Sequence, residues 1–341
     1  MHIIQNERQK AQLVLLNANF IWGITPIFLE VVLKYITPLQ VTTIRFGMAA
    51  IILGIFLYLS KGKKAFSLAS VKILIILGWL DAFGYLTATI GQDLTTPGFA
   101  TLLSSLYVFL VPFIAWKLEK TIIHRNVIYV GILSWFGVFL MSFNGDWSNF
   151  LNSSMVGNCF LIFSAIMWGF YTVITGKYLR EKNDHEEKVD LSSFTFASLF
   201  HTFLALFIIS LLMKEPLPSL PVDIIPYFIF LGLFPTFIAL GLWNWAIIRL
   251  GSVNTSFFQL LQILIPIILE FLLYQQIYSV WIYSGMALIF MSTLWFNGRD
   301  FQKEEVKEDL RSQKKQEEHP VTLSTGLKDI ISVKCCRTPT S

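Results

Sequence analysis

Ten stretches of the chain are each about twenty residues long, strongly apolar and almost free of charge. A helix needs about 20 apolar residues to cross a bilayer, where its backbone polar groups must bond within their own segment. The chain is 55% hydrophobic and only 14% charged, which argues against an ordinary soluble domain. We therefore predict an all-α membrane protein with ten transmembrane helices, at residues 11–33, 38–60, 71–91, 97–117, 126–144, 155–177, 191–213, 222–246, 252–274 and 278–297.

The two halves of this apolar region repeat each other. An offset of 154 residues aligns them without a gap, and an offset of 146 aligns their first helices. The matched pairs include Thr101 with Thr255, Pro112 with Pro266, Gly131 with Gly285 and Trp22-Gly23 with Trp168-Gly169. Duplicated apolar segments are typical of transporters built from repeats, with the binding site between the halves.

Positive charge alternates from loop to loop. Lys and Arg cluster before the first span and after the second, fourth, sixth and eighth, whereas the other loops hold only Lys34 and Lys214. Because such clusters stay on the cytoplasmic side, we predict a protein of the inner or plasma membrane with both termini in the cytoplasm. Five spans per half is an odd number, so the second half must enter from the opposite side. The prediction is therefore two inverted five-helix repeats, residues 11–144 and 155–297.

The segments outside the repeats are polar. Residues 1–10 form a short N-terminal segment, and residues 298–341 carry nine basic and eight acidic side chains. The latter stretch cannot bury enough apolar surface to fold alone, so we predict a disordered cytoplasmic tail. No basic patch with interleaved aromatics indicates nucleic acid, and no cysteine or histidine spacing indicates a metal. Phosphate-loop and nucleophile-elbow motifs are also missing. We expect neither an enzyme nor a resident cofactor.

Two ionisable residues are expected near mid-membrane. Asp81 lies about ten residues into the third span, or roughly 15 Å deep. It is predicted to be a proton relay, an anchor for a cationic substrate group, or a structural hydrogen-bond acceptor. His201, in the seventh span, either carries a coupling proton or is a neutral side chain bonded across a helix interface.

Arg45 and Glu270 are expected in the outer third of the membrane, together with Glu30. A pair of Arg45 with either glutamate would satisfy both charges. Such a pair would be an outer gate that breaks when a cavity opens, or a static contact. Glu30 alternatively extends to the interface.

Amides and aromatic residues mark the candidate centre. Gln259 and Gln262 share nearly one face of the ninth span, where they bind substrate or bond to neighbouring helices. The aromatic side chains predicted to line the site are Trp22, Tyr107, Trp168 and Tyr171. Aromatic walls suit a planar or cationic metabolite, although most aromatics of such a chain face lipid. Pro112 and Pro266 are predicted hinges or static bends.

This pattern resembles the drug/metabolite transporter superfamily, and within it the EamA-type transporters, over residues 11–297. The resemblance is carried by Trp22-Gly23, Thr43-Ile44-Arg45-Phe46, Trp168-Gly169 and the segments around Pro112 and Pro266. Gln275-Gln276 replaces the Gly-Glu that the family has after the ninth helix, and Leu118-Glu119 is its first-half counterpart. Superfamily members carry amino acids, nucleotide sugars, purine-like metabolites and S-adenosylmethionine, so the resemblance does not choose a cargo.

The resemblance and the residues together predict a secondary transporter that works by alternating access. An amino acid or an S-adenosylmethionine-like compound is the favoured cargo, and protons or an exchanged counter-substrate remain alternative driving partners. The oligomeric state is left open. Two competing functions are a membrane-embedded enzyme acting on lipids or isoprenoids and a scaffold acting through residues 298–341.

Overall fold

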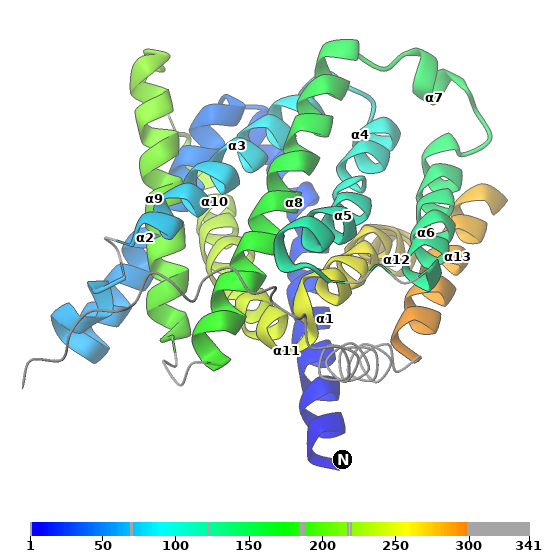
Figure 1. The fold of residues 1–341 in the computed structure, drawn as a ribbon. Helices are drawn as coiled ribbons and strands as arrows, with labels where there is room; N and C mark the ends of the chain where they lie inside the picture. The colour runs from blue at the N-terminus through cyan, green and yellow to red at the C-terminus, as the bar shows by residue number, and fades with distance from the viewer. Residues whose placement is uncertain are drawn as a thin grey trace, which may run out of the picture. The chain divides into compact units, whose positions relative to one another are not determined.

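The computed structural model describes residues 2–68, 71–121, 123, 125–184, 189–216, 218 and 220–298, so the predicted tail lies outside the described residues (Figure 1). Every regular element in these ranges is helical. The α-helices are α1 (His2–Leu33), α2 (Pro38–Lys61), α3 (Lys72–Leu94), α4 (Pro97–Ser104), α5 (Tyr107–Glu119), α6 (Arg125–Phe143), α7 (Ser148–Leu151), α8 (Met155–Asp184), α9 (Leu191–Leu212), α10 (Ile225–Leu231), α11 (Ala239–Gln259), α12 (Leu264–Tyr274) and α13 (Val280–Gly298). The 3-10 segments are η1 (Gly62–Phe66), η2 (Val222–Ile224) and η4 (Leu260–Ile263), and η3 (Gly232–Ile238) is a π-helix.

The helices have the lengths that membrane crossing requires. Eight helical stretches are long and apolar enough to span a bilayer, and Val280–Phe296 is a shorter apolar helix. The stretch Val222–Leu269 has 48 residues, or roughly 72 Å of helix, which is too long for one crossing. Gly251 divides it, because its φ of 78° and ψ of 163° are not helical. The described residues therefore contain ten crossings, and the all-α membrane fold is confirmed.

Helix packing follows the sequence duplication. The second helices of the two halves, α2 and α9, pack together, as do the fifth helices, α6 and α13. The third helix of each half packs on the first helix of the other: α3 packs on α8, and α1 packs on α10 and η3, which begin the third helix of the second half. Exchanging the two halves maps the α2–α9 and α6–α13 pairs onto themselves and the other two pairings onto each other, as expected for inverted repeats related by a two-fold axis.

Two of the crossings are interrupted at matching places. The fourth breaks between Ser104 and Tyr107, where α4 gives way to α5. The ninth breaks at η4, between α11 and α12. Each interruption lies just N-terminal to Pro112 or Pro266, the side on which a proline removes a backbone hydrogen bond. A hinge role for the two prolines remains a prediction. Irregular backbone at membrane depth is tolerated where protein buries it.

An ion pair joins the end of α2 to the start of α9. Asp190 Oδ2 accepts hydrogen bonds from Lys61 Nζ and Ser193 Oγ, both at 2.6 Å. Partial burial raises the pKa of the Asp190 carboxyl, but hydrogen bonds from Lys61, Ser193 and Ser192 outweigh it and lower the pKa to about 2. A carboxyl whose pKa falls on folding stabilises the protein above its unfolded pKa of about 3.9, and this stabilisation is lost as the pH falls toward the folded value.

Asp190→Asn is therefore expected to lower the thermal unfolding midpoint in detergent at pH 7, with the deficit shrinking as the pH falls from about 4 toward 2. Scanning fluorimetry over this range measures both effects. Asp223→Asn, at an exposed aspartate in η2, is the control and should leave the midpoint unchanged. A deficit of the same size at neutral and acid pH would contradict the assignment.

Candidate functional site

The two interrupted crossings meet between the halves of the protein. Tyr107, the first residue of α5, donates from its hydroxyl to Oε1 of Gln259, the last residue of α11, at 2.7 Å. Trp168 of α8 lies edge-on to the buried Tyr107 ring, with centroids 6.4 Å apart. Three of the residues singled out from the sequence are thus brought together.

Arg45 of α2 forms a second cluster beside the first. Its guanidinium lies 4.9 Å from the ring centroid of Tyr85, and its Nε donates to Oγ1 of Thr236 in the π-helix η3. Tyr85 in turn lies edge-on to Trp168, with centroids 5.2 Å apart. Arg45 is only 4% exposed, so its charge is held inside the protein. Tyr85 therefore connects Arg45 to the Tyr107–Gln259 pair.

The π-helix is bound from the first half at a second point. Trp22 of α1 donates from Nε1 to the carbonyl oxygen of Pro235 at 2.8 Å. Thr236 donates from Oγ1 to the carbonyl oxygen of Leu231 at 2.7 Å, so its hydroxyl both accepts from Arg45 and donates within its own helix. Segments of π-helix often occur at functional sites, because they redirect backbone groups.

Asp81 brings the opposite charge to the same region. It is 2% exposed on α3, and its Oδ2 accepts a hydrogen bond from the hydroxyl of Thr202 at 3.1 Å. Asp81 and Arg45 attract each other electrostatically, yet they do not form an ion pair within 4.0 Å. The site therefore holds a buried guanidinium and a buried carboxyl group that do not pair with each other.

Tyr171 packs close to the Asp81 contact. Its hydroxyl lies 3.2 Å from Oγ of Ser198, and its ring stacks on Trp243 with centroids 5.9 Å apart. Ser198 is one helical turn before Thr202, the hydroxyl that binds Asp81. Tyr171 and Asp81 thus contact the same face of α9.

Two other sequence candidates lie against glycines. His201 is buried, its Nδ1 lies 2.7 Å from the carbonyl oxygen of Ala197 in the same helix, and its Cβ abuts Gly78. Gln262 is half-buried, and its backbone carbonyl faces Gly23. A coupling role for His201 and a binding role for Gln262 remain predictions.

The partners considered for Arg45 need correction. Glu30 binds Lys34 of its own helix at 3.4 Å, and its side chain is 77% exposed. A pairing of Arg45 with Glu30 is therefore wrong, because Arg45 instead contacts Thr236 and the Tyr85 ring. The side chain of Glu270 lies outside the described residues, so its pairing with Arg45 remains a prediction.

Comparison with known proteins assigns the family. The sequence matches the EamA-like transporter family over residues 9–143 and again over residues 155–298. The chain belongs to the EamA-like transporter family. Two separate matches, one in each half, agree with the duplication seen in the sequence. This EamA-like protein is thus a multi-pass membrane transporter, a class whose partners are a small-molecule substrate and the lipid bilayer.

Relatives in other organisms carry the same general description. The uncharacterized transporter YyaM of Bacillus subtilis is 23% identical over 291 residues, covering 84% of this chain and 93% of the relative. An uncharacterized transporter of Archaeoglobus fulgidus is 26% identical over 242 residues, covering 70% of each chain. A solved crystal structure of another protein aligns with a TM-score of 0.65 at 16% identity, over 84% of this chain and 96% of that protein's chain. That likeness supports the fold alone.

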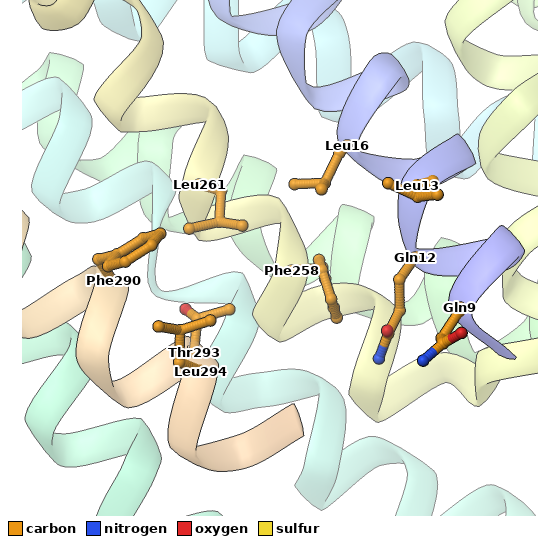
Figure 2. Close-up of a pocket in the computed structure, with 9 residues that line it drawn as sticks. All are labelled: Gln9, Gln12, Leu13, Leu16, Phe258, Leu261, Phe290, Thr293 and Leu294. Atoms are coloured by element: carbon orange, nitrogen blue, oxygen red, sulfur yellow. The ribbon is translucent and has the colours of Figure 1, made fainter. Parts of the chain in front are cut away.

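The EamA-like bundle also has a groove away from this site (Figure 2). Its cavity volume is about 420 Å³, and it lies between α1, α13 and the ninth crossing. The residues that line it are Gln9, Gln12, Leu13, Leu16, Phe258, Leu261, Phe290, Thr293 and Leu294. Leu13 and Leu294 are more than half exposed, so the groove opens on the outer surface of the bundle. It contains none of the charged residues described above.

Sequence reasoning missed Tyr85, Thr202 and Thr236. Tyr85 follows Asp81 by four residues, so helical periodicity alone places both on one face of α3. Thr236 adjoins Pro235, which the 154-residue offset aligns with Asp81. Thr202 carried no signal beyond its place next to His201.

Proposed function

We propose that this EamA-like protein is a secondary transporter for amino acids that works by alternating access between its two halves. The observation that carries the proposal is that Arg45 and Asp81, a buried base and a buried acid, bond to hydroxyl groups and not to each other. A zwitterionic amino acid presents a carboxylate to the guanidinium and an ammonium to the Asp81 carboxylate. Both protein charges would then be satisfied by the cargo.

The aromatic residues support a cationic or planar group in the cargo. Tyr85 lies beside Arg45 and edge to face with Trp168, and Tyr107 adds its ring and its hydrogen bond to Gln259. Aromatic faces attract cations and stack on planar groups. A compound of the S-adenosylmethionine kind, which carries an amino-acid group and a purine, is the second candidate for the same reason.

The direction of the bundle in the membrane follows from its basic residues. The loops after α2, α5 and α8 and before the Gly251 break carry the clustered Lys and Arg, and α1 begins at the same end. We call this the basic end. It lies on the cytoplasmic side in our proposal, which puts both termini in the cytoplasm of the inner or plasma membrane. The repeats are residues 11–144 and 155–297.

A thermal-shift screen of the purified protein against the twenty amino acids and S-adenosylmethionine tests this function. A ligand that binds the folded state at about 100 times its Kd stabilises it by about 2.7 kcal/mol. We expect at least one compound to raise the unfolding midpoint of the protein. The shift should be lost with the amine that lacks the carboxylate and with the acid that lacks the amine.

Two variants test whether the ligand binds at the proposed site. Arg45→Lys should abolish the shift, because a lysine cannot reproduce the planar fork that binds a carboxylate. Cys159→Ser, at an exposed thiol of α8, is the control and should keep it. Equal shifts with the decarboxylated amine, or no shift with any compound of the screen, would overturn the amino-acid proposal. Uptake of the hit into proteoliposomes then tests transport directly.

A further inference from the structure

A buried ion pair joins the two halves at the basic end. Arg180 of α8 donates from Nη2 to Oε1 of Glu119, the last residue of α5, at 2.5 Å. Ser252, the first residue after the Gly251 break, donates to the same Glu119 oxygen at 3.1 Å. The Glu119 side chain is only 7% exposed. Three crossings, the fourth, the sixth and the ninth, are thus tied at one carboxylate.

Two glycines make this contact possible. A Cβ on Gly176, one turn before Arg180, would lie 2.3 Å from Oγ of Ser252. A Cβ on Gly251 would lie 2.9 Å from Nη1 of Arg180, and the φ of +78° at Gly251 favours glycine in any case. Arg180 also donates from Nε to the carbonyl oxygen of Gly176 at 3.1 Å, which orients the guanidinium. The sequence is therefore fitted to bring α8 and the start of the ninth crossing together.

A stripe of polar side chains leads from this contact to the candidate site. Ser252, Thr255 and Gln259 are spaced at i, i+3 and i+7, so they share one face of α11 beyond the break. Thr255 is fully buried, and its hydroxyl has no hydrogen-bond partner within the part of the chain that the structure describes. Gln259, at the inner end of the stripe, accepts the hydrogen bond of Tyr107. The ion pair thus lies at the basic end of this polar face, and the other end of the face reaches the candidate site.

At the opposite end, the repeat-equivalent residues do not supply a matching acid and base. The offset of 146 aligns Arg180 with Lys34, and the offset of 154 aligns Glu119 with Leu273. Lys34 binds Glu30 of its own helix, and both side chains are largely exposed. The Glu119–Arg180 ion pair at the basic end therefore has no equivalent between the aligned residues Lys34 and Leu273, because leucine carries no charge.

We propose that Glu119, Arg180 and Ser252 are the gate at the basic end of the transport path. While the ion pair is formed, α5, α8 and the ninth crossing stay together and close the polar face to solvent at that end. The pair must separate for cargo to pass. The inference rests on alternating access and on the basic end being cytoplasmic, and it does not depend on which compound is carried.

Cysteine accessibility tests the gate without a substrate. Thr255→Cys, in a chain whose Cys159, Cys335 and Cys336 are replaced by serine, is the reporter. A membrane-impermeant maleimide is applied to inside-out and to right-side-out vesicles. We expect slow labelling with the intact gate and at least tenfold faster labelling of inside-out vesicles when Glu119→Gln is added. The charge swap Glu119→Arg with Arg180→Glu should restore slow labelling.

Matched variants separate gating from misfolding. Glu181→Gln removes a 60% exposed carboxylate next to Arg180 and should leave the labelling rate unchanged. Arg180→Lys keeps the charge but loses the forked donor geometry, so an intermediate rate is expected even if Glu119→Gln does not fold. Unchanged labelling in both gate variants overturns the proposal. Faster labelling from the right-side-out face alone overturns it too. If the gate responds as expected and no amino acid binds, only the substrate assignment fails.

Discussion

Gly78→Ala is expected to destabilise the bundle by about 3 kcal/mol, near the upper end of the range for overpacking a core. A Cβ at this position would lie 2.3 Å from Cβ of His201 and 2.7 Å from its carbonyl carbon. Both are atoms that a rotamer change does not move, the Cβ and the backbone carbonyl carbon of His201, so no rotamer change relieves the clash. Helices α3 and α9 would have to move apart, which would also pull Asp81 away from Thr202.

Gly241→Ala provides the matched control for this prediction. A Cβ on Gly241 of α11 meets no atom within 4 Å. Its replacement should leave stability unchanged or raise it by up to about 1 kcal/mol, because alanine favours a helix more than glycine does. Thermal unfolding of both purified variants in the same detergent gives the comparison. Similar unfolding midpoints for the two variants would show that α3 and α9 are not in such close contact.

The fold was largely predictable because the bilayer restricts the possibilities. Span length and apolar composition predicted the crossings, and the break at Gly251 falls between the predicted spans 222–246 and 252–274. The local irregularities were not predictable in the same way. Pro112 and Pro266 were predicted bends or hinges, and the breaks lie just before them, whereas the π-helix around Pro235 was not predicted. How a helix accommodates a proline depends on contacts with neighbouring helices, such as the hydrogen bond from Trp22 to Pro235. Hydrophobic periodicity and composition do not reveal such contacts.

The repeat indicated how deep in the membrane some candidate residues lie. It did not indicate which side chains contact each other between helices. Tyr107 and Gln259 lie at similar levels of their repeats, and the structure adds a hydrogen bond between them that the sequence did not predict. For Arg45, charge complementarity suggested glutamates, but Glu30 pairs with Lys34, and the contacts of Arg45 within the described residues are an aromatic ring and a hydroxyl. Rings and hydroxyls are abundant in such a chain, so no count or spacing identifies the pair that a buried guanidinium meets.

The largest functional effect is expected from Asp81→Asn, which should reduce uptake into proteoliposomes at least tenfold and remove its pH dependence. The amide has nearly the same shape and can still accept a hydrogen bond from Thr202. It cannot bind and release a proton, and it offers no charge to an ammonium group. If Asp81 carries the coupling proton, the uptake of the variant should no longer respond to the imposed pH gradient.

Asp93→Asn is the control for this experiment, because Asp93 lies on the same helix but is exposed. Uptake of the thermal-shift hit is measured over a series of internal and external pH values for wild type and both variants. A lower rate with an unchanged pH profile in Asp81→Asn would make Asp81 an anchor for the cargo and not the proton carrier, and His201 would become the candidate to test. Unchanged uptake and an unchanged profile would remove Asp81 from the site altogether, since this carboxyl group, 2% exposed and bonded to Thr202, would then serve only the packing of α3 on α9.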